Sequence, residues 1–195
     1  AMESRGLGDV YKRQDQYSKE FIRRSPFLCL GTANDGGKLD VSPRGDGPGF
    51  VLILDDNTIF IPERPGNRRV DSLSNIVDNP NVGLLFMIPG FDDTLRVNGT
   101  AMVIRDESLL AQCEVNGKVP KLGIQVHVEE AYIHCAKAFK RSKFWDPDSK
   151  QDRSEMPSIA KIILDQVAAE NESPSEESVK EADAFVEDDY KNNLY

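Results

Sequence analysis

The stretch that decides the fold runs from Val41 to Pro80 and reads VSPRGDGPGFVLILDDNTIFIPERPGNRRVDSLSNIVDNP. It contains two short apolar segments, Phe50–Leu54 and Thr58–Ile61, on either side of an Asp-Asp-Asn turn. This pattern predicts a β-hairpin. A helix is predicted to begin near Asn67, because Val70, Leu73, Ile76 and Val77 recur at three- and four-residue spacing, and to end at the Asn79-Pro80 pair.

The start of this predicted helix carries a concentration of positive charge. Arg68 and Arg69 lie at the start, and Arg64 lies just upstream. A helix N-terminus has partial positive charge and unpaired N–H groups, so it favours anions. A phosphate would satisfy both the N–H groups and the guanidinium groups. Glu63 and Asp71 could instead neutralise the arginines on a solvated surface, and the local chemistry leaves both interpretations open.

Most of the negative charge lies at the C-terminal end of the chain. The 195 residues carry a formal net charge of −9. Residues 149–195 hold 12 acidic and 5 basic side chains, whereas residues 1–148 hold 21 acidic and 19 basic ones. Because the body is almost neutral, it lacks the broad basic surface typical of nucleic-acid-binding proteins, and we expect no nucleic-acid partner.

Cysteine usage and hydropathy indicate the compartment. The three cysteines form no C-x-x-C pair, which fits a reducing environment better than a disulfide framework. No apolar run is long enough to span a bilayer, and no secretory signal is visible. We therefore expect a cytoplasmic protein that does not interact with a membrane.

Alternation of apolar residues and turn signals predict a mainly β body with short helices. Residues 1–14 lack periodicity and are interpreted as a non-native or disordered leader. Helices are expected at Asp15–Ser25, with Tyr17, Phe21 and Ile22 on one side, and at Asp106–Gln112. The further expected strands are Phe27–Ala33, Leu39–Pro43, Asn81–Pro89 buried on both faces, Thr94–Ile104, and Leu122–Cys135 with a bulge at Glu129-Glu130. The hairpin spacing favours a mostly antiparallel barrel over a parallel sheet.

The chain changes character after residue 148. The pattern predicts two amphipathic helices in residues 149–195, with acidic residues on their outer faces. They could pack on the body or on a partner subunit, or the tail could be partly disordered. The expected organisation is a leader at 1–14, a barrel domain at 15–148 and an acidic helical tail at 149–195.

Several single residues are candidates for a site. Arg96 lies mid-strand on a polar face, either as a binding residue or as an ordinary exposed arginine. His134, Lys137 and Trp145 fall in a cation-rich segment that follows the last strand. His127 and His134 differ in strand parity, so no metal site is predicted. No nucleophile elbow supports a Ser-His-Asp triad either.

Together, these motifs resemble a known family, the pyridoxamine 5′-phosphate oxidase-like FMN-binding split-barrel proteins, and in particular a bacterial subgroup of it. The resemblance covers about residues 21–147. It rests on five motifs: Ser42-Pro43-Arg44-Gly45-Asp46; Pro62-Glu63-Arg64-Pro65-Gly66-Asn67-Arg68-Arg69 with Asp71-Ser72-Leu73; Asn79-Pro80 before Val82-Gly83-Leu84-Leu85-Phe86; Leu95-Arg96-Val97-Asn98-Gly99; and His134-Cys135-Ala136-Lys137-Ala138 through Trp145.

The resemblance implies a six-stranded antiparallel split β-barrel, with the C-terminal helices outside the family pattern. It also implies a homodimer that holds FMN at the subunit interface. The cofactor-binding residues that it implies are Ser42, Pro43, Arg44, Pro62, Glu63, Arg64, Asn67, Arg68, Arg69, Arg96, His134, Lys137 and Trp145. Of these, His134, Lys137 and Trp145 are expected to close the site from the second subunit.

Two departures from the family pattern bear on the activity. Pro62-Glu63 stands where the oxidases have tyrosine and threonine, and the oxidases' C-terminal R-x-H segment is absent. The resemblance thus implies an FMN-dependent oxidoreductase acting on a small molecule, with NADH or NADPH as a possible electron donor, but not vitamin B6 oxidation itself. The alternatives are a non-catalytic flavin or tetrapyrrole carrier, and a scaffold whose acidic tail docks a partner.

Overall fold

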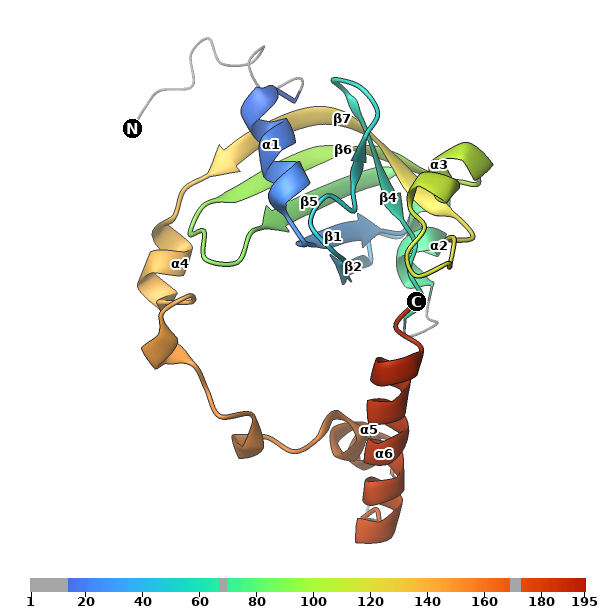
Figure 1. Cartoon of the computed structure of the whole chain (residues 1–195), viewed down its shortest axis with the longest axis vertical. Coiled ribbons are helices and arrows are strands. Elements are labelled where there is room, and N and C mark those ends of the chain that lie inside the picture. The colour runs from blue at the N-terminus through green and yellow to red at the C-terminus, as the bar shows by residue number, and fades with distance from the viewer. Residues whose placement is uncertain (1–13, 67–69, 169–172) are drawn as a thin grey trace. The chain divides into compact units, whose positions relative to one another are not determined.

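The computed structural model describes residues 14–66, 70–168 and 173–195 of the chain. The chain divides into two compact units, Ala1–Asp146 and Pro147–Tyr195 (Figure 1). Gln14 is buried, and its backbone N–H donates to the Asp56 carbonyl at 3.1 Å, so it belongs to the folded part of the first unit.

The first unit is built on one antiparallel sheet with the strand order β2-β1-β5-β6-β7-β4-β3. The strands are β1 (Phe27–Ala33), β2 (Leu39–Gly45), β3 (Leu52–Ile53), β4 (Thr58–Pro62), β5 (Asn81–Met87), β6 (Thr94–Ile104) and β7 (Gly123–His134). The end strands β2 and β3 are not paired with each other, so the sheet curves without closing (Figure 1). This confirms the predicted antiparallel split barrel with helices. The sheet has seven strands where six were predicted, and β3, the first strand of the predicted hairpin, is only two residues long.

The longest strand pair, β6 with β7, contains the predicted bulge. Asn98 lies opposite Glu130 and Gly99 lies opposite Val128, so Glu129 is the extra residue. A Cβ atom on Gly99 would lie 2.0 Å from the carbonyl oxygen of His127. The bulge is therefore compatible only with glycine at this position.

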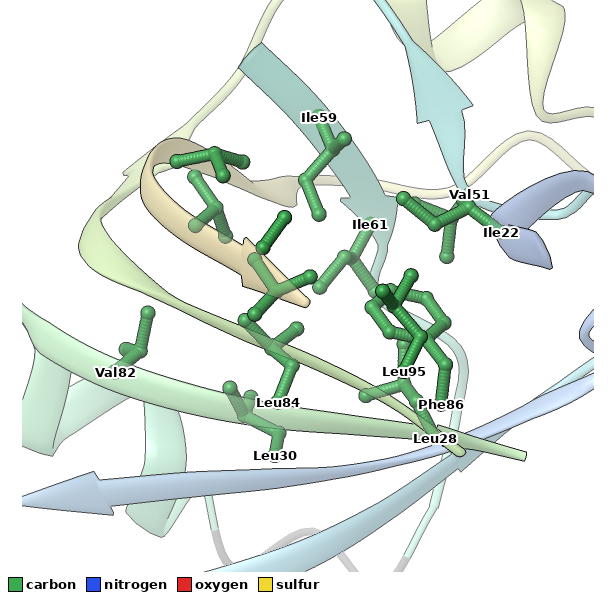
Figure 2. Close-up of a cluster of buried hydrophobic side chains, with 14 of the residues drawn as sticks. Ile22, Leu28, Leu30, Val51, Ile59, Ile61, Val82, Leu84, Phe86 and Leu95 are labelled. Atoms are coloured by element: carbon green, nitrogen blue, oxygen red, sulfur yellow. The ribbon is translucent and has the colours of Figure 1, made fainter. Parts of the chain in front are cut away.

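The core lies on the concave side of the sheet. Side chains from four strands and from α1 (Gln16–Arg24) point toward one another, with Ile22, Leu28, Ile61, Phe86 and Leu95 fully buried (Figure 2). Full burial of a side chain of this size contributes roughly 1.5–3 kcal/mol relative to exposure. The alternating strand pattern therefore supplies most of the driving force that holds the barrel together.

Two details of burial differ from the sequence prediction. β5 is not buried on both faces, because Gly83, Leu85 and Met87 alternate with fully buried neighbours and are themselves half-buried. In α1, Asp15 caps the helix by accepting the Ser18 N–H at 2.7 Å, but Tyr17 is 70% exposed and does not join Phe21 and Ile22 against the core. The prediction for Tyr17 was therefore wrong.

The helix after β4 begins later than predicted. α2 spans Asp71–Asp78, and its N-cap residue Val70 has a left-handed backbone with φ 50°. This conformation is unfavourable for a β-branched residue. Ile76 packs on the core, whereas Val70 and Val77 are exposed and do not extend the predicted apolar stripe.

The remaining helices are short or lie in the second unit. α3 (Glu107–Gln112) and α4 (Lys137–Ser142) belong to the first unit. The second unit contains two single 3-10 turns (Pro147–Ser149 and Arg153–Glu155) and two α-helices, α5 (Ile159–Val167) and α6 (Glu176–Asn192). Ser158 and Ser175 cap these two helices through their hydroxyl groups. Within the described residues, no helix is long and apolar enough to cross a membrane.

Candidate functional site

A row of polar side chains lies on the concave face of β2. Successive side chains of a strand alternate between faces, so Asp40, Ser42 and Arg44 share one face and Pro43 points to the other. Arg44 lies opposite Leu28 and Ser42 opposite Leu30 in the register with β1. Because those two leucines are buried in the core, the polar row faces the inside of the barrel.

Two ion pairs, one from this row and one from Asp46 just after β2, reach the segment that follows β4. Arg44 pairs with Glu63, and the Arg64 Nε donates to an Asp46 carboxylate oxygen at 2.7 Å. The Arg64 guanidinium also donates to the Cys113 carbonyl at 2.8 Å. β2 and β4 are not hydrogen-bonded neighbours in the sheet. Side-chain ion pairs thus bridge the split that the backbone ladder leaves open.

One donor in this cluster is unsatisfied. The Arg44 Nε is buried and has no hydrogen-bond partner among the described residues, while its Nη1 pairs with Glu63. A buried donor without a partner costs about 1–3 kcal/mol. The Nε itself is covered by protein, whereas the Arg44 side chain as a whole is 13% exposed, so a polar ligand at the split would contact the exposed part of this side chain.

α2 is tied to the other end of the polar row. The Ser72 hydroxyl donates to Asp40 at 3.4 Å, and the Asn75 amide donates to the Thr32 hydroxyl at 3.0 Å. Ser72 and Thr32 are buried. These bonds place the first turn of α2 beside β2, so one continuous polar strip runs from α2 along β2 to Glu63.

The predicted site residues divide into three sets. Arg44, Glu63 and Arg64 are brought together at the split, and Ser42 shares a face of β2 with Arg44. Buried Pro62 ends the strand that precedes Glu63 and Arg64. Pro43 lies on β2 but on its outer face. Asn67, Arg68 and Arg69 lie outside the described residues, so their predicted role in phosphate binding stays a prediction.

The third set lies elsewhere on the first unit. Arg96 is on the outer face of β6, with its guanidinium carbon 5.5 Å from the centre of the Tyr132 ring. His134 and Lys137 are exposed at the end of β7 and the start of α4. The Trp145 indole N–H donates to the Phe91 carbonyl at 2.7 Å, and its ring stacks on Phe139. No hydrogen bond or ion pair connects this set to the split within the described chain.

Sequence reasoning missed several residues of the strip. Five residues contribute to the strip but are not among the predicted site residues: Asp40, Asp46, Ser72, Asn75 and Thr32. Asp46 and Ser72 belong to motifs of the family resemblance, but the sequence assigns them no role in the site. Asp40 could have been found from parity alone, since it continues the i, i+2 series of Ser42 and Arg44 on β2. Asp46 follows the end of the strand, so parity does not predict its contact with Arg64. The contact of Asn75 with Thr32 depends on how α2 docks, which the sequence pattern does not reveal.

The chemistry of the strip favours an uncharged or anionic organic ligand over a metal. Its donors are guanidinium and hydroxyl groups, and each carboxylate of the two ion pairs already faces an arginine. In the part of the chain that the structure describes, no group of three or more His, Cys, Asp or Glu side chains could hold a metal ion. Burial raises the pKa of the nearby Cys113 thiol, so this group is a neutral packing residue at physiological pH.

Comparison with known proteins agrees with this architecture. HupZ from Group A Streptococcus matches with a TM-score of 0.50 and 20% identity, over 62% of this chain and 93% of that chain. General stress protein 26 from Bacillus anthracis matches with a TM-score of 0.46 and 18% identity, over 59% of this chain and 88% of that chain. An FMN-binding protein from Syntrophomonas wolfei matches with a TM-score of 0.46 and 10% identity, over 61% of this chain and 89% of that chain. At these identities, the similarity to HupZ indicates a shared fold and nothing more.

Sequence comparison identifies the family. No curated protein sequence matches the chain. The family profile described as pyridoxamine 5′-phosphate oxidase matches residues 15–135, which include all seven strands of the sheet. The chain therefore belongs to the pyridoxamine 5′-phosphate oxidase family.

Proposed function

We propose that this chain is an FMN-binding flavoprotein and that the polar strip of α2, β2 and the β4 end forms part of the cofactor site. The observation that carries the proposal is that the side chains of Ser42 and Arg44 face the inside of the barrel beside the split, where Glu63 orients the Arg44 guanidinium. FMN presents a phosphate, ribityl hydroxyls and ring carbonyls, all of which accept hydrogen bonds. The guanidinium of Arg44 and the hydroxyl of Ser42 are matching donors on one face of β2.

Each part of the strip has a role in this proposal. Arg44 and Ser42 hold the ligand, and Glu63 fixes the orientation of the Arg44 guanidinium. Arg68 and Arg69, which precede α2, bind the phosphate. When bound, FMN supplies hydride and electron transfer, and the protein supplies binding and electrostatics. Under this proposal no side chain needs to act as a general acid or base.

A homodimer is the proposed assembly. Leu39 and Val41, on the outer face of β2, are 79% and 68% exposed. Half-buried Leu85 and Met87 lie on the same outer face of the sheet. An apolar surface of this kind supports association with a second subunit. His134, Lys137 and Trp145 of that subunit would then complete the site.

We further propose that the protein is an oxidoreductase for a small-molecule substrate, with NADH or NADPH as the electron donor. Cytoplasmic location is also proposed, because Cys29, Cys113 and Cys135 are all unpaired thiols. The test is anaerobic addition of NADH or NADPH to the FMN-loaded protein while its visible absorption is recorded. Bleaching is expected; flavin that stays oxidised with either donor would favour the carrier alternative.

Binding itself is tested by titrating the protein with FMN and following flavin fluorescence. Arg44→Ala should weaken binding about tenfold or more, since one charge-assisted hydrogen bond is worth roughly 1.5–3 kcal/mol. The matched control is Arg105→Ala, because Arg105 is exposed and lies outside the strip. Circular dichroism shows whether each variant is folded. Equal FMN affinity in a folded Arg44→Ala protein would contradict the proposed site.

A further inference from the structure

The second unit presents apolar side chains that its own packing does not use. α5 and α6 pack on each other, with Ala160 buried and Val179, Ala182 and Val186 half-buried. On α5, Ile159, Ile163 and Val167 recur at four-residue spacing and are all exposed, Val167 by 73%. Residues at this spacing form one stripe along a helix. The α5 stripe is thus a continuous apolar surface.

α6 adds an exposed aromatic residue among carboxylates. Phe185 is 73% exposed. Glu181, Asp188 and Asp189 lie four residues before it, three after it and four after it, so all three neighbour it on the helix surface. All three are exposed. An aromatic ring beside several carboxylates matches an arginine or lysine, which can stack on the ring while pairing with the acids.

From this pattern, we propose that the α5–α6 unit is a docking surface for a cationic amphipathic segment of a partner protein. The α5 stripe would bind the apolar face of that segment, and the carboxylates around Phe185 would bind its lysines or arginines. This is a function separate from flavin binding and does not rest on it.

Charge decides among the possible occupants. Residues 149–195 hold 12 acidic and 5 basic side chains. A second copy of the same unit would place like charges against each other, and nucleic acid or an anionic lipid surface would be repelled in the same way. An uncharged apolar partner would leave the carboxylates around Phe185 without a role. A basic amphipathic segment is complementary to both, because its apolar face matches the α5 stripe and its cations match the carboxylates.

The experiment uses the full chain and a fluorescently labelled helical peptide with leucines along one face and lysines along the other, and binding is followed by fluorescence anisotropy. Saturable binding is expected. The double variant Ile163→Ser with Phe185→Ala should weaken it about tenfold or more, because it removes two apolar side chains that the peptide would bury. Val77→Ala, a change at an exposed apolar residue of α2, is the matched control and should bind as the parent does. Equal affinity of the double variant and the parent would overturn the proposal.

Two further measurements keep the test decisive. Asp188→Asn with Asp189→Asn should weaken peptide binding and flatten its salt dependence without removing any apolar contact, so it stays informative if the first variant folds poorly. A peptide of the same composition with its leucines scattered around the helix should bind more weakly. If the peptide with scattered leucines binds equally well, binding depends on charge alone and not on an apolar face, and the proposal fails. If Ile163→Ser changes the sedimentation of the free chain, a second copy covers the stripe and the proposal also fails.

Discussion

Gly99 is the residue at which the β6–β7 pair leaves no room for a side chain. A Cβ there would lie 2.0 Å from the His127 carbonyl oxygen and 3.3 Å from the Glu129 nitrogen, which are both backbone atoms in the bulge. Backbone atoms in a paired strand cannot move away as a flexible side chain can. Gly99→Ala should lower the free energy of unfolding by roughly 1–3 kcal/mol or more, as measured by urea denaturation. Gly47→Ala is the matched control, because a Cβ atom on Gly47 would meet nothing within 4 Å.

The sequence predicts that Arg68 and Arg69 bind the FMN phosphate. Replacing both with alanine should weaken FMN binding by a factor on the order of a hundred or more, since each charge-assisted hydrogen bond contributes roughly 1.5–3 kcal/mol. Riboflavin lacks the phosphate, so it should bind the double variant and the parent equally. Fluorescence quenching with both ligands separates loss of the phosphate site from unfolding. If the double variant loses equal affinity for FMN and riboflavin, the arginines do not bind the phosphate and are solvated surface charges.

At the scale of elements, the ion pairs across the split take the place of a missing strand pairing. The Asp46 side chain is 5% exposed and that of Arg64 is 14% exposed. Removing one partner of such a pair leaves the other charge poorly solvated. Asp46→Ala should therefore lower the free energy of unfolding by roughly 2–4 kcal/mol, a value reduced for the partial exposure of Arg64. Thermal and urea unfolding would show this, whereas Asp35→Ala, in the exposed turn between β1 and β2, should have little effect.

The strands could be predicted from the sequence because alternation is a local signal. β1 was predicted at its observed bounds, and the bulge at Glu129 was expected. The start of α2 could not be predicted, because Val70 adopts a left-handed conformation that its residue type disfavours. At the site, β2 parity predicts that Ser42 and Arg44 share a face, whereas the pairing of Arg44 with Glu63 depends on the curvature of the whole sheet.

At the scale of the whole molecule, the family profile lies entirely within the first unit, and most of the net negative charge lies in the second. The profile ends at residue 135, and the first unit ends at Asp146. That unit contains the entire seven-stranded sheet, its core and the polar strip. The contact of Trp145 with Phe91 also lies within it. Everything that the flavin proposal requires of one subunit is thus contained in the first unit.

A chain that ends at Asp146 should therefore fold and bind FMN with the affinity of the full chain. It should also lose binding of the cationic amphipathic peptide, because α5 and α6 are absent. The two readouts are flavin fluorescence and peptide anisotropy, and circular dichroism verifies the β structure of the shortened chain. Loss of FMN from a folded, shortened chain would place part of the flavin site in the second unit. Retained peptide binding would instead place the docking surface in the first unit, so each result identifies which proposal fails.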